Sequence, residues 1–131
     1  MSRLDRLALI GNHLPRRCGI ATFTHDLHNA ITVTSPHLST SVVAMNDADQ
    51  IYSYPRAVSL TVRDGVVSDY HRAATFLNTS RTPAVSLQHE YGISRGEAGG
   101  HIVELISRLD MPVVTTLHTV LPAPSAAQAR V

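Results

Sequence analysis

Apolar and polar positions along the chain follow two different periods. Short apolar or β-branched runs at residues 7–10, 40–45, 84–87 and 113–117 are typical of strands buried in a parallel sheet. Residues 56–63 instead alternate between apolar and polar side chains, which predicts a half-exposed strand at a sheet edge. The chain therefore has five expected strands, four of them buried.

Helical periodicity fills the segments between these strands. Apolar residues recur at three- and four-residue spacing in residues 19–31, 66–77 and 96–109, which predicts three amphipathic helices. Ser125 and Gln128 have the spacing of a capping box, so a further helix is expected to begin there. Strands that alternate with helices predict an α/β fold with a Rossmann-like, doubly wound, mostly parallel sheet.

The domain organisation follows from the same pattern. The opening strand, glycine loop, helix and strand form a βαβ unit, and 131 residues suit a single domain spanning residues 1–131. A helix that begins at Ser125 would have less than two turns, too few to be stable alone. The sequence therefore predicts a domain truncated at its C-terminus.

Composition narrows the class of protein. The chain is 44% apolar, and its formal net charge of +1 gives no electrostatic footprint for nucleic acid or an anionic membrane. The single cysteine, Cys18, excludes an intrachain disulfide and fits a reducing compartment. The apolar run at residues 7–10 is too short for a signal peptide or a transmembrane segment. A cytoplasmic protein is expected.

Three polar segments follow predicted strands and are the candidate sites. The first is the loop at residues 12–19, where Gly19 opens a helix that could present backbone N–H groups to an anion, with Arg16 and Arg17 beside it. It matches neither a dinucleotide-binding nor a Walker motif. Alternatively, Gly19 only turns the chain and the arginines are solvated. Cys18 could be a nucleophile or a small buried apolar residue.

The second and third candidate segments are residues 88–92 and His118. His89 and Glu90 place an imidazole beside a carboxylate where a buried strand ends, although both could simply satisfy backbone groups there. His118 directly follows another strand and is expected to share one cleft with His89, because the carboxyl ends of parallel strands meet at one edge. A metal site built from His13, His89, Glu90 and His118 is a weaker alternative, since no local ligand pair is present.

Three stretches together resemble a known family. They are L-P-R-R-C-G-I-A-T-F at residues 14–23, V-S-L-Q-H-E-Y-G-I at 85–93 and P-V-V-T-T-L-H-T-V-L-P at 112–122. In this order, each at a predicted strand end, they resemble the N-terminal, acceptor-side domain of bacterial group 1 retaining glycosyltransferases of GT-B fold. The resemblance extends from residue 7 to residue 128.

The resemblance implies transfer of a sugar from a nucleotide-sugar donor to a sugar or lipid acceptor, with retention and without a metal or other cofactor. Gly19, with Arg17 and Ile20, would line the cleft near the donor phosphates, and His118 would act as the catalytic residue near the transferred sugar. The acceptor side would be lined by four consecutive residues, His89, Glu90, Tyr91 and Gly92.

Two departures from the family pattern shape the functional hypothesis. The family's nucleotide-binding C-terminal domain is absent, and Ser94-Arg95 stands where an aromatic residue and a glycine are expected. The sequence therefore predicts an acceptor-binding half that is inactive alone and is either a fragment or a chain that works with a separate donor-binding domain. The alternatives are a non-catalytic interaction module of the same fold and a metal-dependent hydrolase that uses His89, Glu90 and His118.

Overall fold

A computed structural model describes residues 4–47 and 49–131, which form one five-stranded sheet with strand order β3-β2-β1-β4-β5. All four strand pairs are parallel. This arrangement confirms the predicted α/β, Rossmann-like class. The strands are β1 (Arg6–Gly11), β2 (Ser39–Asn46), β3 (Val58–Arg63), β4 (Val85–His89) and β5 (Val113–Leu117).

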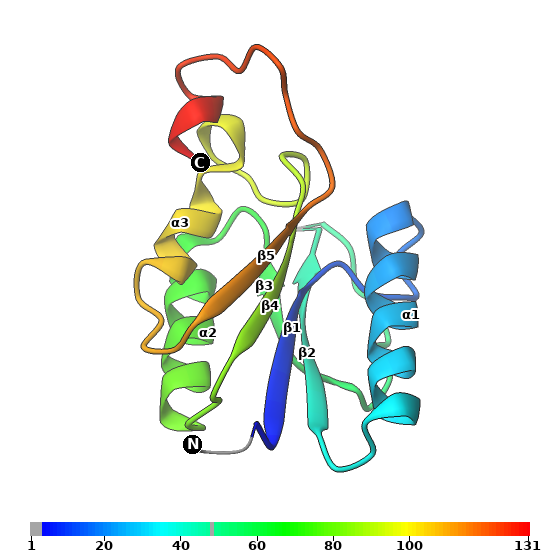
Figure 1. Cartoon of the computed structure of the whole chain (residues 1–131). Helices are drawn as coiled ribbons and strands as arrows, with labels where there is room; N and C mark the ends of the chain where they lie inside the picture. Colours follow the sequence, from blue (N-terminus) through cyan, green and yellow to red (C-terminus); the bar gives the residue numbers. More distant parts are fainter. Residues whose placement is uncertain (1–3, 48) are drawn as a thin grey trace.

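The helices lie on both faces of the sheet. Helix α1 (Gly19–Thr34) covers one face, and α2 (Val67–Thr79) and α3 (His101–Ile106) cover the other (Figure 1). Two three-residue 3₁₀ turns, η1 (Glu97–Gly99) and η2 (Gln128–Arg130), complete the elements. We call the two faces the α1 face and the α3 face.

Side-chain alternation along the strands produces two separate cores. Successive residues of a strand point to opposite faces, so Leu9 joins the α1 face while Ile10 joins the α3 face. The α3-face core is the larger and includes Tyr70, Leu77 and Leu105. This is why the central strands read as continuous apolar runs, with both faces covered.

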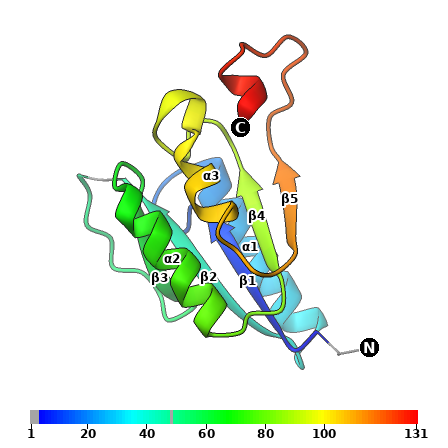
Figure 2. The ribbon, with the colours of Figure 1, turned by 90° about the vertical axis from the view of Figure 1, so that its left-hand side faces the viewer.

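The sheet has a topological switch point between β1 and β4. From β1 the chain moves outward to β2 and then β3, and from β4 it moves the opposite way to β5 (Figure 2). The loops after β1 and β4 therefore diverge at the carboxyl edge of the sheet. Ligands of open α/β sheets bind at such a point, and the candidate residues lie there.

Two predicted elements differ from the structure. The helix expected over residues 96–109 is interrupted, because Gly96 and Gly99 adopt φ of 88° and 78° and leave only a 3₁₀ turn before the short α3. The strand at residues 113–117 is not buried. It is the edge strand β5, and most of its side chains are exposed.

Other local predictions are confirmed. The strand that alternates, β3, is the opposite edge of the sheet. Ser125 and Gln128 form the expected reciprocal cap, with the Ser125 N–H donating to Gln128 Oε1 at 2.9 Å and the Gln128 N–H donating to Ser125 Oγ at 3.2 Å. Within residues 4–47 and 49–131, no helix combines the length and apolarity that crossing a membrane requires.

Candidate functional site

The α1 face of the carboxyl edge is organised by close packing at Gly11. A Cβ on Gly11 would lie 2.9 Å from Thr24 Oγ1 and 3.1 Å from Gln88 Cβ. Only a residue without a side chain allows α1 to approach β1 and β4 this closely. Gly11 therefore fixes where the first turns of α1 lie relative to Gln88.

Gln88 in turn positions His118 on the same face. The His118 Nε2–H donates to Gln88 Oε1 at 2.9 Å, while the Gln88 amide N–H donates to Ser86 Oγ at 3.2 Å. Because Gln88 offers an acceptor, the proton of the neutral imidazole is held on Nε2 and the lone pair is on Nδ1. In that neutral form, His118 presents a hydrogen-bond acceptor with a defined ring orientation.

Phe23 of α1 forms the other side of the His118 site. The two rings meet edge to face, with centroids 4.7 Å apart. Phe23 belongs to the apolar helical pattern of residues 19–31, but the structure leaves it 42% exposed, because Ala21 and Thr24 are the residues that the first half of α1 buries. Phe23 is therefore part of the candidate site rather than the core.

Gly19 lies one turn before Phe23 at the N-terminus of the 16-residue helix α1. Residues four apart share a helix face, so Gly19 lies on the side of α1 that meets His118. No atom lies within 4 Å of the Cβ that an alanine at Gly19 would carry, so the space above it is open. Ile20 packs against the α3-face core and anchors the helix start instead of facing this space.

The N-cap of α1 is Cys18, whose Sγ accepts from the Ala21 N–H at 3.3 Å and from the Asn12 amide at 3.3 Å. This pair of contacts gives Cys18 a structural role at the helix start, where Ser, Thr, Asp or Asn usually serve.

The two neighbouring arginines have different environments. Arg16 is held by Asp47, with NH1 2.6 Å from Oδ1, and also donates to Asn12 Oδ1 at 3.0 Å. Arg17 is exposed, and no hydrogen bond or ion pair involves its side chain among the described residues. Arg17, the predicted phosphate contact, is thus the arginine that remains available, and Arg16 stabilises the loop.

His13 is a buried histidine on the same loop, with 1% of its surface exposed. Its Nδ1–H donates to the Leu14 carbonyl at 2.8 Å, and its Nε2 is buried without a partner among the described residues. Burial is the main cause that lowers the pKa of His13 below the ordinary 6.5. The ring is therefore neutral at pH 7.

Glu90 ties the loops after β4 and β5 together. Its Oε1 accepts from the Tyr91 N–H at 3.0 Å, and its Oε2 accepts from the Thr119 hydroxyl. Both carboxylate oxygens are thus occupied within the protein. The bond to the Tyr91 N–H is of the backbone-satisfying kind that is one of the two expectations for Glu90.

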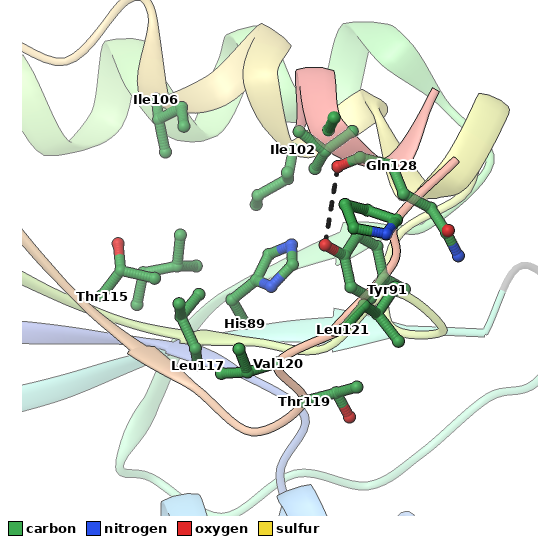
Figure 3. Close-up of a pocket in the computed structure, with 14 residues that line it drawn as sticks. His89, Tyr91, Ile102, Ile106, Thr115, Leu117, Thr119, Val120, Leu121 and Gln128 are labelled. Carbon is green, nitrogen blue, oxygen red and sulfur yellow. Dashed lines mark hydrogen bonds between the residues drawn. The ribbon is translucent and has the colours of Figure 1, made fainter. Parts of the chain in front are cut away.

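His89 and Tyr91 line a pocket of about 330 Å³ on the α3 face (Figure 3). Their rings meet edge to face with centroids 5.1 Å apart. His89 is 9% exposed, and burial lowers its pKa below 6.5. Gly92, next in the chain, is exposed, and no atom lies within 4 Å of its hypothetical Cβ.

The two imidazoles expected in one cleft lie on opposite faces of the sheet. His89 follows Val85 and Leu87 onto the α3 face, whereas His118 contacts Gln88 and Phe23 on the α1 face. A strand sends alternate side chains to opposite faces, and residues 88 and 89 are neighbours. The prediction of one shared pocket is therefore wrong, although both residues lie at the carboxyl edge.

The same separation removes the expected metal site. Among the residues that the structure describes, no three or more His, Cys, Asp or Glu side chains are grouped so that they could hold a metal ion. The combination of His13, His89, Glu90 and His118 does not form. The metal-dependent hydrolase alternative has no ligand set in this structure.

Arg95 is the second residue of the Ser94-Arg95 pair that departs from the family pattern. Its Nε lies 3.2 Å from Asp64 Oδ1, so the side chain ties the turn after β4 to the turn after β3. It does not line the α3-face pocket. Arg95 thus holds two neighbouring turns together.

Comparison with known protein families, curated proteins and solved structures finds no match to this chain. What the structure defines is the class, an α/β domain with a five-stranded parallel sheet of Rossmann-like topology. Within it, the carboxyl edge carries two separate candidate sites. We call them the His118 site, formed by Gly19, Phe23, Gln88 and His118 on the α1 face, and the His89 pocket on the α3 face.

Proposed function

We propose that this chain is the acceptor-side domain of a retaining glycosyltransferase that takes a sugar from a nucleotide-sugar donor, with the His118 site facing the reacting groups. The observation that carries the proposal is the Gln88–His118 hydrogen bond of 2.9 Å at the switch point of the sheet. It fixes the orientation of the imidazole, with Nε2 directed to Gln88, on the face where α1 begins.

The surroundings of His118 suit both the leaving diphosphate and the transferred sugar of such a reaction. The N-terminus of α1 favours an anion because its first N–H groups are unpaired and its dipole is positive there. Arg17 adds a cation whose side chain has no partner among the described residues, and Gly19 leaves space for close approach. A leaving diphosphate would occupy this end, and His118 would accept a hydrogen bond from a hydroxyl of the transferred sugar.

The chemistry assigned to His118 is positioning by hydrogen bonding. A fixed acceptor at the reacting sugar contributes to orientation and to stabilising charge that develops at the anomeric carbon. The donor nucleotide would be gripped by a separate donor-binding domain, and the acceptor would be a sugar or a lipid. A reducing, cytoplasmic location agrees with the lone Cys18, which is unpaired.

The test is a nuclear magnetic resonance titration of the ¹⁵N-labelled chain with UDP-, GDP- and ADP-glucose and a panel of mono- and disaccharides. At least one compound should shift the amides of Gly19, Phe23 and His118 in a saturable way. His118→Ala should weaken that binding about 5- to 10-fold, the loss of roughly one hydrogen bond. His37→Ala, at an exposed turn residue, is the matched control.

Two outcomes separate the proposal from its rivals. If no compound shifts these amides, or if His118→Ala binds as tightly as the unchanged protein, the His118 site is not a sugar site. If sugars bind but no glycosylated product forms when a donor-binding domain is added, the chain is an interaction module of the same fold.

A further inference from the structure

The His89 pocket is a concave site on the α3 face, separate from the His118 site. It lies between β4, β5, α3 and the segment after β5, and its residues are drawn in Figure 3. Its wall is mostly aliphatic, with Leu87, Ile102, Ile106 and Leu117 among the contributors. Among the residues that the structure describes, no Asp, Glu, Lys or Arg side chain lines it.

His89 provides a hydrogen-bonding group inside this apolar pocket. Its side chain is nine-tenths buried, and its ring points into the space bounded by Ile102 and Tyr91 (Figure 3). Nδ1 is buried without a partner, and neither ring nitrogen is hydrogen-bonded to any residue that the structure describes. An unpaired buried polar atom costs free energy, which a ligand that pairs with it would recover.

Tyr91 supplies a second, weaker polar point. Its hydroxyl is 3.5 Å from the Gln128 carbonyl, at the limit of a hydrogen bond. The hydroxyl can therefore turn to a ligand at little cost. Small-molecule sites typically combine an apolar wall with a few polar groups that fix orientation, at volumes from about 300 Å³ upward.

We propose that the His89 pocket binds a small uncharged alcohol, aromatic or aliphatic, whose apolar body fills the aliphatic wall and whose hydroxyl pairs with His89. A charged ligand is disfavoured because no charged side chain of the described residues lines the pocket and an unpaired ion would be desolvated there. At about 30 Å³ per water-sized group, the volume accommodates roughly ten heavy atoms.

The experiment compares three probes of one shape, namely 2-naphthol, naphthalene and 2-naphthoate. Amide shifts of the ¹⁵N-labelled chain are followed during titration at pH 7.5. We expect saturable binding of 2-naphthol with shifts in β4, α3 and residues 119–131, binding of naphthalene about 5- to 10-fold weaker, the worth of one hydrogen bond, and no binding of 2-naphthoate.

Variants test the role of the named residues. His89→Phe keeps an aromatic ring and should reduce 2-naphthol affinity to the naphthalene level. Thr115→Trp replaces an exposed lining residue, so it leaves the core intact and should block all three probes. Ile51→Ala, at a fully exposed loop residue, should change nothing.

Several results would overturn the proposal. They are the absence of saturable binding, equal binding of 2-naphthol and 2-naphthoate, shifts confined to other elements, or unchanged affinity in both His89→Phe and Thr115→Trp. Concentration-dependent self-association that excludes 2-naphthol would instead assign the pocket to a second copy of the chain. None of these results depends on sugar transfer, which the titration of the His118 site tests separately.

Discussion

The Nε2 atom of His118 lies 2.9 Å from Oε1 of Gln88, so two residues from neighbouring strand ends form one hydrogen-bonded unit on the α1 face. Gln88 is almost fully buried and is itself fixed by Ser86. The direction of the His118 lone pair is therefore a property of β4. A substitution in β4 that moves Gln88 will therefore change the orientation of the His118 ring, even though His118 itself is unchanged.

Gln88→Leu should release His118 while keeping a side chain of similar size. The chain should lose about 1 kcal/mol of stability, typical of one hydrogen bond, and the imidazole should no longer hold its proton on Nε2 alone. Long-range ¹H–¹⁵N spectra report the tautomer directly. An unchanged tautomer in the variant would show that Gln88 does not set it.

Gly11→Ala should destabilise the protein by about 1–3 kcal/mol, the usual cost of overpacking, because the added Cβ would lie 2.9 Å from Thr24 Oγ1. Urea denaturation measures the loss. Gly19→Ala is the matched control, since its Cβ meets no atom within 4 Å. It should be neutral or stabilise the chain by up to about 1 kcal/mol. Equal effects at both positions would contradict the packing argument.

Acid should weaken the fold from about pH 6.5 downward. Burial lowers the pKa of His13 and His89 in the folded state, so as the pH falls the unfolded chain takes up these protons first. Stability is therefore full above 6.5 and decreases toward the lower folded-state pKa values, by up to about 1.4 kcal/mol per pH unit for each proton. Urea midpoints between pH 7.5 and 4.5 measure the slope.

Two variants test whether His13 and His89 cause this decrease in stability at acid pH. His13→Gln and His89→Gln should each flatten the decrease in stability, whereas His37→Gln, at an exposed residue, should leave it unchanged. If the slope were the same in all variants, other groups would carry the acid sensitivity.

A second acid effect should arise at Asp69. Its Oδ2 accepts from the Arg63 N–H at 3.0 Å and from Arg63 Nε at 2.8 Å, and the Arg63 hydrogen bonds hold the pKa of Asp69 below the ordinary 3.8. Stability from this carboxylate is present above 3.8 and is lost as the pH falls through the folded-state pKa. Asp69→Asn should lower the urea midpoint at pH 7, and the difference from the unchanged protein should shrink as the pH falls below 3.8.

Much of the fold follows from the apolar pattern. The runs in β1, β2 and β4 sit in strands covered on both sides, and periodicity placed those strands correctly. The same reasoning fails at β5, because its β-branched residues suit an edge strand as well as a buried one. It also fails at residues 96–109, where the backbone at Gly96 and Gly99 overrides the helical pattern.

The site could be predicted only in part. Sequence reasoning placed His89, Glu90 and His118 at strand ends, which the structure confirms. The face on which each side chain lies depends on the strand register, because a shift of one residue moves every side chain to the other face. The sequence does not determine the register of β4 to a single residue. Gly11, Phe23 and the pairing of Gln88 with His118 were missed. The glycine directly after an apolar run was the one signal that could have indicated close packing.

The backbone N–H of His118 donates to the carbonyl of His89 at 3.0 Å, and Glu90 joins the two following loops. The His118 site and the His89 pocket therefore share a partition that is one strand thick. Any occupant that shifts this partition on one side changes the other side's affinity, and thermodynamic linkage requires the effect to be reciprocal. β4 is therefore the common wall of the two sites, because it supplies Gln88 to one and His89 to the other.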